Sequence, residues 1–487
     1  MKQFPFKQSQ LTVFIALMLV NFFFSCKDDK DTISETEKQQ AWSKEIFENM
    51  KEIYLWDMAL PASFNATKYS TAQDALDYLC SLKINPLTNQ PIDKYSFIDE
   101  IGKLSGEIEG GVSTGDYGFM VTAAYNASNK VAFYVTYVYK DSPAGKAGVR
   151  RTYEITKING STQVNPTVGS DGYLVTTSAG FTNMVNALFN SSTASFTFKK
   201  PSGATLDVSL SASGSYTINS ILHDSTYTVG AQKVGYMVFN EFLGTPSQTE
   251  LTNQINEFQA NGVKTMIVDL RYNGGGSVQT CDSLCNLLAP AAANGKLMYK
   301  YTFNALLTNA FAKDPSLRSY FRKNNSLELS SIYFIVSDNT ASASELLINN
   351  LRPYFPGKLF LIGSTTYGKP CGFWATPIGY TENQTTTKEG YDLYAVSFET
   401  QNANSEGNYY AGMTPGTTTY PGVEARDFFD LEWGDANDEC LKQALNHIAT
   451  GSFLDIPQSV KGIKNFQKKN QLNFKFRGMV DYRRSKI

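Results

Sequence analysis

Alternating strand-like and helix-like segments in the second half of the chain constrain its fold most strongly. Apolar runs of strand length lie at 234–239, 265–270, 332–336 and 359–363. Segments with helical spacing of apolar residues lie between or after them, at 251–258, 278–288 and 342–351. Such alternation is typical of α/β domains, in which helices cover the faces of a mostly parallel sheet. The sequence therefore predicts an α/β domain over about 223–450, within a multidomain chain of 487 residues.

The rest of the chain divides into segments of different character. Residues 27–40 are polar and charged, which predicts a flexible tether. Apolar residues at helical spacing predict a small helical N-terminal domain over 41–108, and strand-like runs predict a β-rich domain over 109–222. Residues 451–487 form a C-terminal extension, and its basic end is typical of a solvated surface.

The first 26 residues have the pattern of an export signal. Lys2 and Lys7 precede an apolar run at 11–24 that is too short for a comfortable membrane span. The run ends at Ser25-Cys26 and a charged stretch follows, which resembles a bacterial lipoprotein signal with Cys26 as the lipidated residue. This resemblance implies a lipid anchor in the cell envelope of a Gram-negative bacterium. We expect an outer-membrane lipoprotein, facing either the periplasm or the surface. An ordinary cleaved signal with an incidental cysteine is the alternative.

Composition narrows the possible partners and cofactors. The 43 basic and 45 acidic residues give a net charge of −2, which disfavours a nucleic-acid partner that would need broad phosphate neutralisation. The two histidines, His223 and His447, are far apart in the sequence, so a histidine-rich metal site is not expected. Cys281 and Cys285 fit one face of a helix and predict buried apolar surface, not a zinc site.

The β-rich segment resembles a PDZ domain. The residues that carry the resemblance are Ser142-Pro-Ala-Gly-Lys-Ala-Gly148 and Ile155-Thr-Lys-Ile-Asn-Gly160, a pattern found in PDZ modules of bacterial proteases. Four residues stand where that family has its carboxylate-binding loop: Tyr117, Gly118, Phe119 and Met120. The resemblance implies that backbone amides there bind the C-terminus of a peptide, which adds as a strand. Thr152-Tyr153 replaces the usual Gly-Asp, and a generic β-rich domain is the alternative.

Three segments of the predicted α/β domain contain residues suited to catalysis. Asp269-Leu-Arg-Tyr-Asn-Gly-Gly-Gly276 ends a strand in glycines, which let a backbone approach a ligand closely or simply make a tight turn. Asp338-Asn-Thr-Ala-Ser-Ala-Ser-Glu345 places serines at a helix start, where they can serve as a nucleophile or as half of a capping box. Thr365-Thr-Tyr-Gly-Lys369 places a lysine in an apolar setting, where a lowered pKa would let it act as a base.

Together these segments, in this order after the PDZ-like segment, resemble the C-terminal processing (tail-specific) serine peptidases. The resemblance covers about 109–450 and implies a peptidase core of the crotonase/Clp-like type with a Ser/Lys dyad. It implies Ser342 as nucleophile, with Ser344 as the fallback, and Lys369 as general base. It also implies an oxyanion hole made by the amide of Gly275 or Gly276 together with that of Ala343. The expected partner is a protein or peptide bound by its C-terminus, and no metal or organic cofactor is expected.

One departure from the family's pattern concerns the lysine. Members often carry a glutamine four residues after it, which orients the amine, whereas this chain has Phe373. Glu399 and Thr400, on a later predicted strand, are possible substitutes. Packing alone could also hold Lys369.

Two other functions compete with a peptidase. A catalytically inactive, peptide-binding lipoprotein could use the same fold, and Phe373 favours it, while the intact Ser342 and Lys369 favour an enzyme. A glycan-binding outer-membrane lipoprotein is the second rival. Those proteins are mainly helical repeats, and the strand-rich middle of this chain shows no such period.

Overall fold

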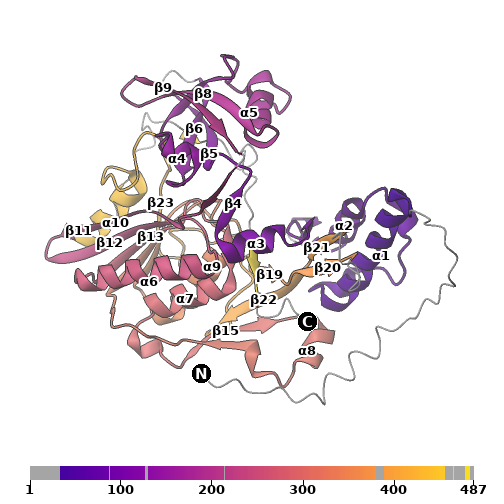
Figure 1. The fold of residues 1–487 in the computed structure, drawn as a ribbon. Helices are drawn as coiled ribbons and strands as arrows, with labels where there is room; N and C mark the ends of the chain where they lie inside the picture. The colour runs from indigo at the N-terminus through magenta and orange to yellow at the C-terminus, as the bar shows by residue number, and fades with distance from the viewer. Residues whose placement is uncertain are drawn as a thin grey trace.

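A computed structural model describes residues 33–86, 88–126, 130–212, 214–379, 389–455, 464–465 and 478–482 (Figure 1). The predicted signal at 1–26, Cys26 included, and residues 27–32 of the predicted tether lie outside the described residues. None of the helices in the described ranges is long and apolar enough to cross a membrane.

The α/β core is built on a six-stranded sheet. Its strands, in spatial order, are β11 (Ile221–Val229), β12 (Gln232–Phe239), β13 (Thr265–Asp269), β17 (Ser331–Val336), β18 (Leu359–Gly363) and β23 (Gly422–Glu424). All neighbours pair in parallel except β11, which is antiparallel to β12. Every residue of β13 is buried, as expected of a central strand with both faces covered. The predicted α/β fold is therefore confirmed.

Helices cover both faces of this sheet (Figure 1). One face packs against α6 (Thr245–Ala260), α7 (Val278–Leu288) and α9 (Ala343–Leu351). The other packs against α10 (Glu439–Thr450). Cys281 and Cys285 are both buried on α7, as their spacing predicted.

A second sheet joins distant parts of the chain. Its strands, in order, are β14 (Gly275–Ser277), β25 (Gly478–Val480), β19 (Cys371–Phe373), β22 (Val396–Asn402), β15 (Leu297–Thr302) and β16 (Arg318–Tyr320). β25 belongs to the C-terminal extension and lies between β14 and β19, parallel to both. Residues 478–481 are buried, so this part of the extension is a core strand, while the basic residues for which a solvated surface was predicted lie outside the described residues.

The N-terminal segment packs onto the core instead of forming a purely helical domain. Its elements are α1 (Glu35–Ile53), α2 (Ala72–Ser81), β1 (Ile84–Asn85), β2 (Gln90–Pro91), β3 (Phe97–Glu100) and α3 (Lys103–Gly110). β3 joins a sheet with β20 (Thr376–Ile378) and β21 (Tyr391–Tyr394), and one hydrophobic cluster contains residues of both regions. α1 starts inside the predicted tether because Ser34 and Glu37 form a capping box.

The segment over 109–222 forms an antiparallel sheet set above the core in Figure 1. The strands, in order, are β24 (Lys464–Asn465), β5 (Phe119–Tyr125), β6 (Val131–Val138), β7 (Glu154–Ile158), β8 (Thr193–Lys199) and β9 (Thr205–Ser211). Of these, β24 comes from the C-terminal extension and pairs with β5. The helices α4 (Pro143–Lys146) and α5 (Ala179–Phe189) belong to the same segment, and β4 (Val112–Thr114) pairs with β10 (Ser215–Thr217) where the chain enters and leaves it. The interpretation of this segment as a PDZ module stays a prediction.

Candidate active site

Ser342 is the residue at which the chain turns into α9. It caps the helix with φ +58° and ψ −106°, a backbone conformation that residues with a side chain rarely adopt. The residue is fully buried, and its Oγ makes no hydrogen bond of normal geometry with the described residues. A strained backbone and a buried hydroxyl without a partner are both uncommon, and strain of this kind is concentrated at functional sites.

Ser344, the fallback nucleophile, is in a different situation. Its Oγ donates a hydrogen bond to the Asn273 carbonyl oxygen at 3.1 Å, so the hydroxyl holds α9 against the glycine-rich turn. The two serines are both buried. Of the two, Ser342 is the one whose hydroxyl has no structural hydrogen bond among the described residues.

The carboxylate of Glu345 brings Ser342 and Lys369 together. Its Oε2 accepts hydrogen bonds from the backbone amides of Ser342 and Lys369, each at 2.8 Å. Its Oε1 accepts from the Gly368 amide at 2.8 Å and from the Thr366 hydroxyl at 2.5 Å. The two candidate residues are therefore joined through a single oxygen atom.

Sequence reasoning assigned Glu345 only to a capping box. The helix-capping contact exists, but the same carboxylate also binds the turn that carries Lys369. Burial raises the pKa of Glu345, and the hydrogen bonds from Thr366, Lys369, Ser342 and Gly368 counter this rise. A buried glutamate is rare unless it is paired. The sequence shows a glutamate among small and apolar residues, but it does not show which groups pair with it.

Lys369 is fully buried, and burial lowers its pKa to about 7. The carboxyl groups of Asp93 and Glu345 oppose this shift without cancelling it. A lysine with a pKa near 7 is largely neutral at slightly alkaline pH, and a neutral amine can accept a proton.

Aromatic rings surround the amine. Lys369 Nζ lies 3.8 Å from the centroid of the Phe373 ring and 5.2 Å from that of Tyr95. Phe373 is the last residue of β19, four residues after Lys369. Tyr95 comes from the N-terminal segment, and sequence reasoning did not identify it as part of the site. Glu399, a suggested substitute for the missing glutamine, is paired opposite Cys371 and accepts a hydrogen bond from Tyr410.

The glycines predicted for the oxyanion hole lie beside the start of α9. A side-chain carbon on Gly275 would lie 3.1 Å from the Ala343 amide nitrogen and 2.3 Å from the Gly478 carbonyl oxygen. Gly275 and Gly276 have φ values of +111° and +132°, which strongly favour glycine. The Gly275 amide donates to Asn273 Oδ1 at 2.9 Å, so it is already engaged in this structure.

Both edges of β14 are occupied. On one edge Phe242 donates to the Gly275 carbonyl at 3.0 Å and accepts from the Ser277 amide at 2.6 Å. On the other edge β25 is paired, with Gly276 opposite Met479. An extended substrate can therefore pair with β14 only after one of these neighbours moves.

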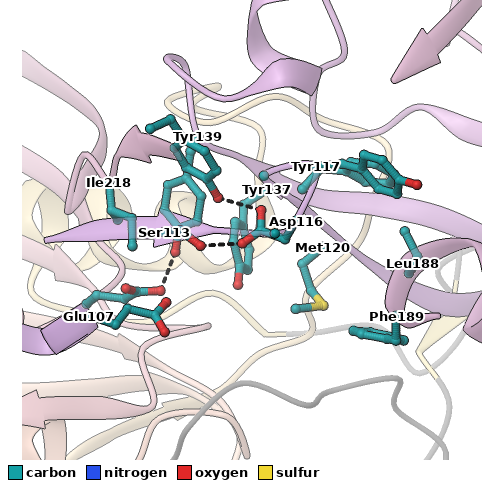
Figure 2. A pocket seen from close by; sticks show the side chains of 15 residues that line it. Glu107, Ser113, Asp116, Tyr117, Met120, Tyr137, Tyr139, Leu188, Phe189 and Ile218 are labelled. Carbon is teal, nitrogen blue, oxygen red and sulfur yellow. Dashed lines mark hydrogen bonds between the residues drawn. The ribbon is translucent and has the colours of Figure 1, made fainter. Parts of the chain in front are cut away.

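The loop predicted to bind a carboxylate lines a cavity of about 300 Å³ (Figure 2). Gly118 has φ +78°, and a side-chain carbon there would lie 1.9 Å from the Ser142 Cβ. The apolar part of the lining is Met120, Leu188 and Phe189. The acidic part is Glu107, Asp116 and Glu241, and Asp116 accepts hydrogen bonds from Ser113 and from Tyr216. Tyr117, Gly118, Phe119 and Met120 thus all line one cavity, and their role in binding a peptide end stays a prediction.

No group of three or more His, Cys, Asp or Glu side chains in the described ranges is placed to hold a metal ion.

Comparison with known proteins shows which family two parts of the chain resemble. A family model described as peptidase family S41 matches residues 233–402, and a model described as the peptidase S41 N-terminal domain matches residues 38–97. The carboxyl-terminal-processing protease of Picosynechococcus is 28% identical over 178 residues, which are 37% of this chain and 39% of that protein. The carboxy-terminal processing protease CtpA of Bacillus subtilis is 22% identical over 354 residues, 69% of this chain and 65% of that protein.

These alignments cover less than two thirds of either relative's own length. A crystal structure from Bacteroides fragilis, described as an S41 protease, matches with a TM-score of 0.64 and 22% identity, covering 84% of this chain and 97% of that one. That likeness shows a common fold. Residues 233–402 and 38–97 of this chain are therefore similar to peptidase family S41 and to the N-terminal domain of that family.

Proposed function

We propose that this chain is a serine endopeptidase in which Ser342 is the nucleophile and Lys369 the general base. The observation that carries the proposal concerns the Glu345 carboxylate. One of its oxygens, Oε2, accepts hydrogen bonds from the backbone amides of both residues. Similarity to peptidase family S41 supports the reaction class. The unpartnered hydroxyl of Ser342 and the lowered pKa of Lys369 support the assignment of roles.

The reaction would proceed by acyl transfer. Neutral Lys369 accepts the Ser342 proton as Oγ attacks the carbonyl carbon of the scissile peptide bond. The amide of Ala343, with that of Gly275 or Gly276, stabilises the oxyanion. Protonated Lys369 then donates its proton to the departing amine. Water, deprotonated by the same lysine, releases the acyl group from Ser342.

We infer that substrates are exported proteins selected by their C-terminal segments. The cavity at Tyr117, Gly118, Phe119 and Met120 would receive the peptide end, and the apolar side chains of Leu188 and Phe189 would contact its last residue. The sequence supports anchoring through Cys26 and a place in the cell envelope.

Cleavage of an unstructured protein tests the dyad. We expect the 27–487 form to cleave casein between pH 6 and 10, and we expect Ser342→Ala and Lys369→Ala each to reduce the rate by at least about 10³-fold, as loss of a nucleophile or its base does. Ser344→Ala is the matched control, because it removes a buried hydroxyl two residues away that donates to a backbone carbonyl. If Ser344→Ala is inactive and Ser342→Ala still cleaves, the wrong serine has been assigned.

An inactive peptide-binding protein is the second candidate. It is favoured by the full burial of Ser342, by the occupied edges of β14, and by Phe373 in place of glutamine. Reaction with a fluorophosphonate distinguishes the two, since an activated serine is labelled covalently and an inert one is not. Absence of both labelling and casein cleavage would support the binding protein.

A further inference from the structure

The amine of Lys369 lies between two aromatic rings that come from different parts of the chain. Phe373, on β19, is 3.8 Å from Nζ at its ring centroid, and Tyr95, from the N-terminal segment, is 5.2 Å away. Both rings are buried, with Phe373 at 0% and Tyr95 at 7% exposure. The amine is therefore shielded from water by side chains that were assigned no role from the sequence.

Tyr95 is held in place at both of its ends. Its phenol donates a hydrogen bond to the Gly368 carbonyl at 2.7 Å, directly before Lys369 in the chain. Its backbone amide donates to Asp93 Oδ1 at 2.9 Å. The Asp93 carboxylate is itself fixed, because Tyr54 donates to it at 2.7 Å and the Ser96 hydroxyl at 2.6 Å.

We propose that Tyr95 is a positioning residue for the general base, acting through its ring beside Nζ and through its hydrogen bond to the residue before Lys369. This inference rests on the proposed function, since it concerns how Lys369 is presented to Ser342. The N-terminal segment thus completes the catalytic site, which accounts for its sharing a core with 371–396.

Ring faces restrict where the amine can lie, because they pack against Nζ from two parts of the chain. An aromatic face attracts an ammonium group and accepts weak N–H contacts from a neutral amine. The two rings, and the bond from Tyr95 to Gly368, therefore limit the positions that Nζ can take.

The charged groups around Lys369 give the sign of the expected effect. Burial is the largest influence on its pKa and lowers it, while the carboxyl groups of Asp93 and Glu345 raise it. Removing the Tyr95 ring would weaken the attraction to the ammonium, which lowers the pKa, but would admit water, which raises it. Because burial dominates, we expect the admission of water to prevail and the pKa to rise.

The experiment compares Tyr95→Leu, Tyr95→Phe and Phe373→Met in the full chain. For Tyr95→Leu and Phe373→Met we expect kcat at pH 8 to fall by roughly 10²-fold, the loss that a misplacement of about 1 Å causes, with KM within about twofold. The acidic limb of the pH profile should move to higher pH in both variants. Tyr95→Phe keeps the ring and loses only the bond to Gly368, so its kcat should lie between those of Tyr95→Leu and the wild type.

Tyr69→Leu is the matched control. Tyr69 is an N-terminal tyrosine that stacks on Phe64, so its loss disturbs the same segment away from the dyad. We expect it to change stability and not the pH profile. If Tyr95→Leu is folded and its kcat and pH profile equal those of the wild type, the inference is wrong even though the peptidase assignment stands.

A readout that does not require activity separates this inference from the proposed function. In protein carrying Ser342→Ala, NMR of 13C- and 15N-labelled lysine follows the titration of Lys369, assigned by its loss in Lys369→Met. An upward pKa shift in Tyr95→Leu and in Phe373→Met, and none in Tyr69→Leu, supports positioning by the rings even if no substrate is cleaved. An unchanged titration in both ring variants overturns it.

Discussion

At the scale of single residues, the site depends on a carboxylate that binds backbone and not on a side chain that touches substrate. Glu345 accepts from two amides through one oxygen and from an amide and a hydroxyl through the other. Because all of its partners are donors, only a group that accepts through both oxygens fits there. The hydrogen bonds to Glu345 therefore fix the backbone at both residues of the proposed dyad.

Glu345→Gln tests this dependence. The amide group of glutamine would place a donor against donors, so we expect a loss of about 1–3 kcal/mol in the free energy of unfolding. We also expect slower cleavage at unchanged KM, because Ser342 and Lys369 would separate. Urea unfolding and casein cleavage measure the two effects. Glu439→Gln is the control, since Glu439 also lies in the first turn of a helix and accepts from a backbone amide, but at the surface.

The buried amine of Lys369 should make stability depend on pH. Its folded-state pKa of about 7 lies below the value near 10.4 that is usual in unfolded chains. Between these values the unfolded state binds more protons, so stability rises with pH across that window. Below about pH 7 the lysine is protonated in both states, so burial of the ammonium lowers the free energy of unfolding by its full amount.

Lys369→Met removes that cost while keeping the side chain's length. We expect the variant to unfold at a higher temperature than the wild type at pH 6.5, and the difference to shrink at pH 9. Thermal unfolding followed by circular dichroism at the two values measures this. A difference that is equal at both pH values would contradict the lowered pKa.

At the scale of elements, the spacing of apolar residues predicted the helices and strands that bury their own apolar side chains. The strands β12, β13, β17 and β18 and the helices α7 and α9 lie where apolar spacing placed them, since each buries its own apolar residues. The dyad, the glycines and the loop at 117–120 could be proposed from motifs. Tyr95 and the strand β25 could not, because each takes its place through partners hundreds of residues away.

β25 shows this limit best and leads to a prediction. Met479 is fully buried between β14 and β19, although its three-residue strand carries no pattern that signals burial. Met479→Ala should lower the free energy of unfolding by about 2–5 kcal/mol, as truncation of a buried methionine does. Because β25 covers one edge of β14, a loosened β25 should also speed fluorophosphonate labelling of Ser342.

Met58→Ala is the control for that experiment, since Met58 is 90% exposed. Chemical unfolding and labelling rates are compared in the two variants. Loss of stability without faster labelling would show that β25 does not restrict access to Ser342.

At the scale of the whole molecule, one aspartate connects the strand-rich domain to the α/β core. Asp427 Oδ1 accepts from Arg151 Nη2 and from Arg271 Nη1, each at 2.8 Å. Arg151 belongs to the strand-rich domain, and Arg271 follows β13 directly before the glycine-rich turn, where it also pairs with Asp269 and Asp438. Burial raises the pKa of Asp427, but the charges of Arg271 and Arg151 outweigh it and hold the pKa low. The two domains thus meet at a charged cluster shielded from water.

Asp427→Asn should weaken the contact between the two domains more than the loss of an exposed ion pair would. The change leaves two guanidinium groups buried with less negative charge, and breaking a buried pair costs about 3–5 kcal/mol. Because Arg271 keeps Asp269 and Asp438 while Arg151 has Asp427 as its ion-pair partner within the described ranges, the loss should fall mainly on the strand-rich domain. Hydrogen exchange should therefore rise in β5–β9 and stay low in β12, β13 and β17.

Glu154→Gln is the control, since it breaks the partly exposed pair with Lys199 and should lower the free energy of unfolding by less than about 1 kcal/mol. Equal losses in the two variants, or exchange that rises uniformly, would show that Asp427 does not hold the domains together.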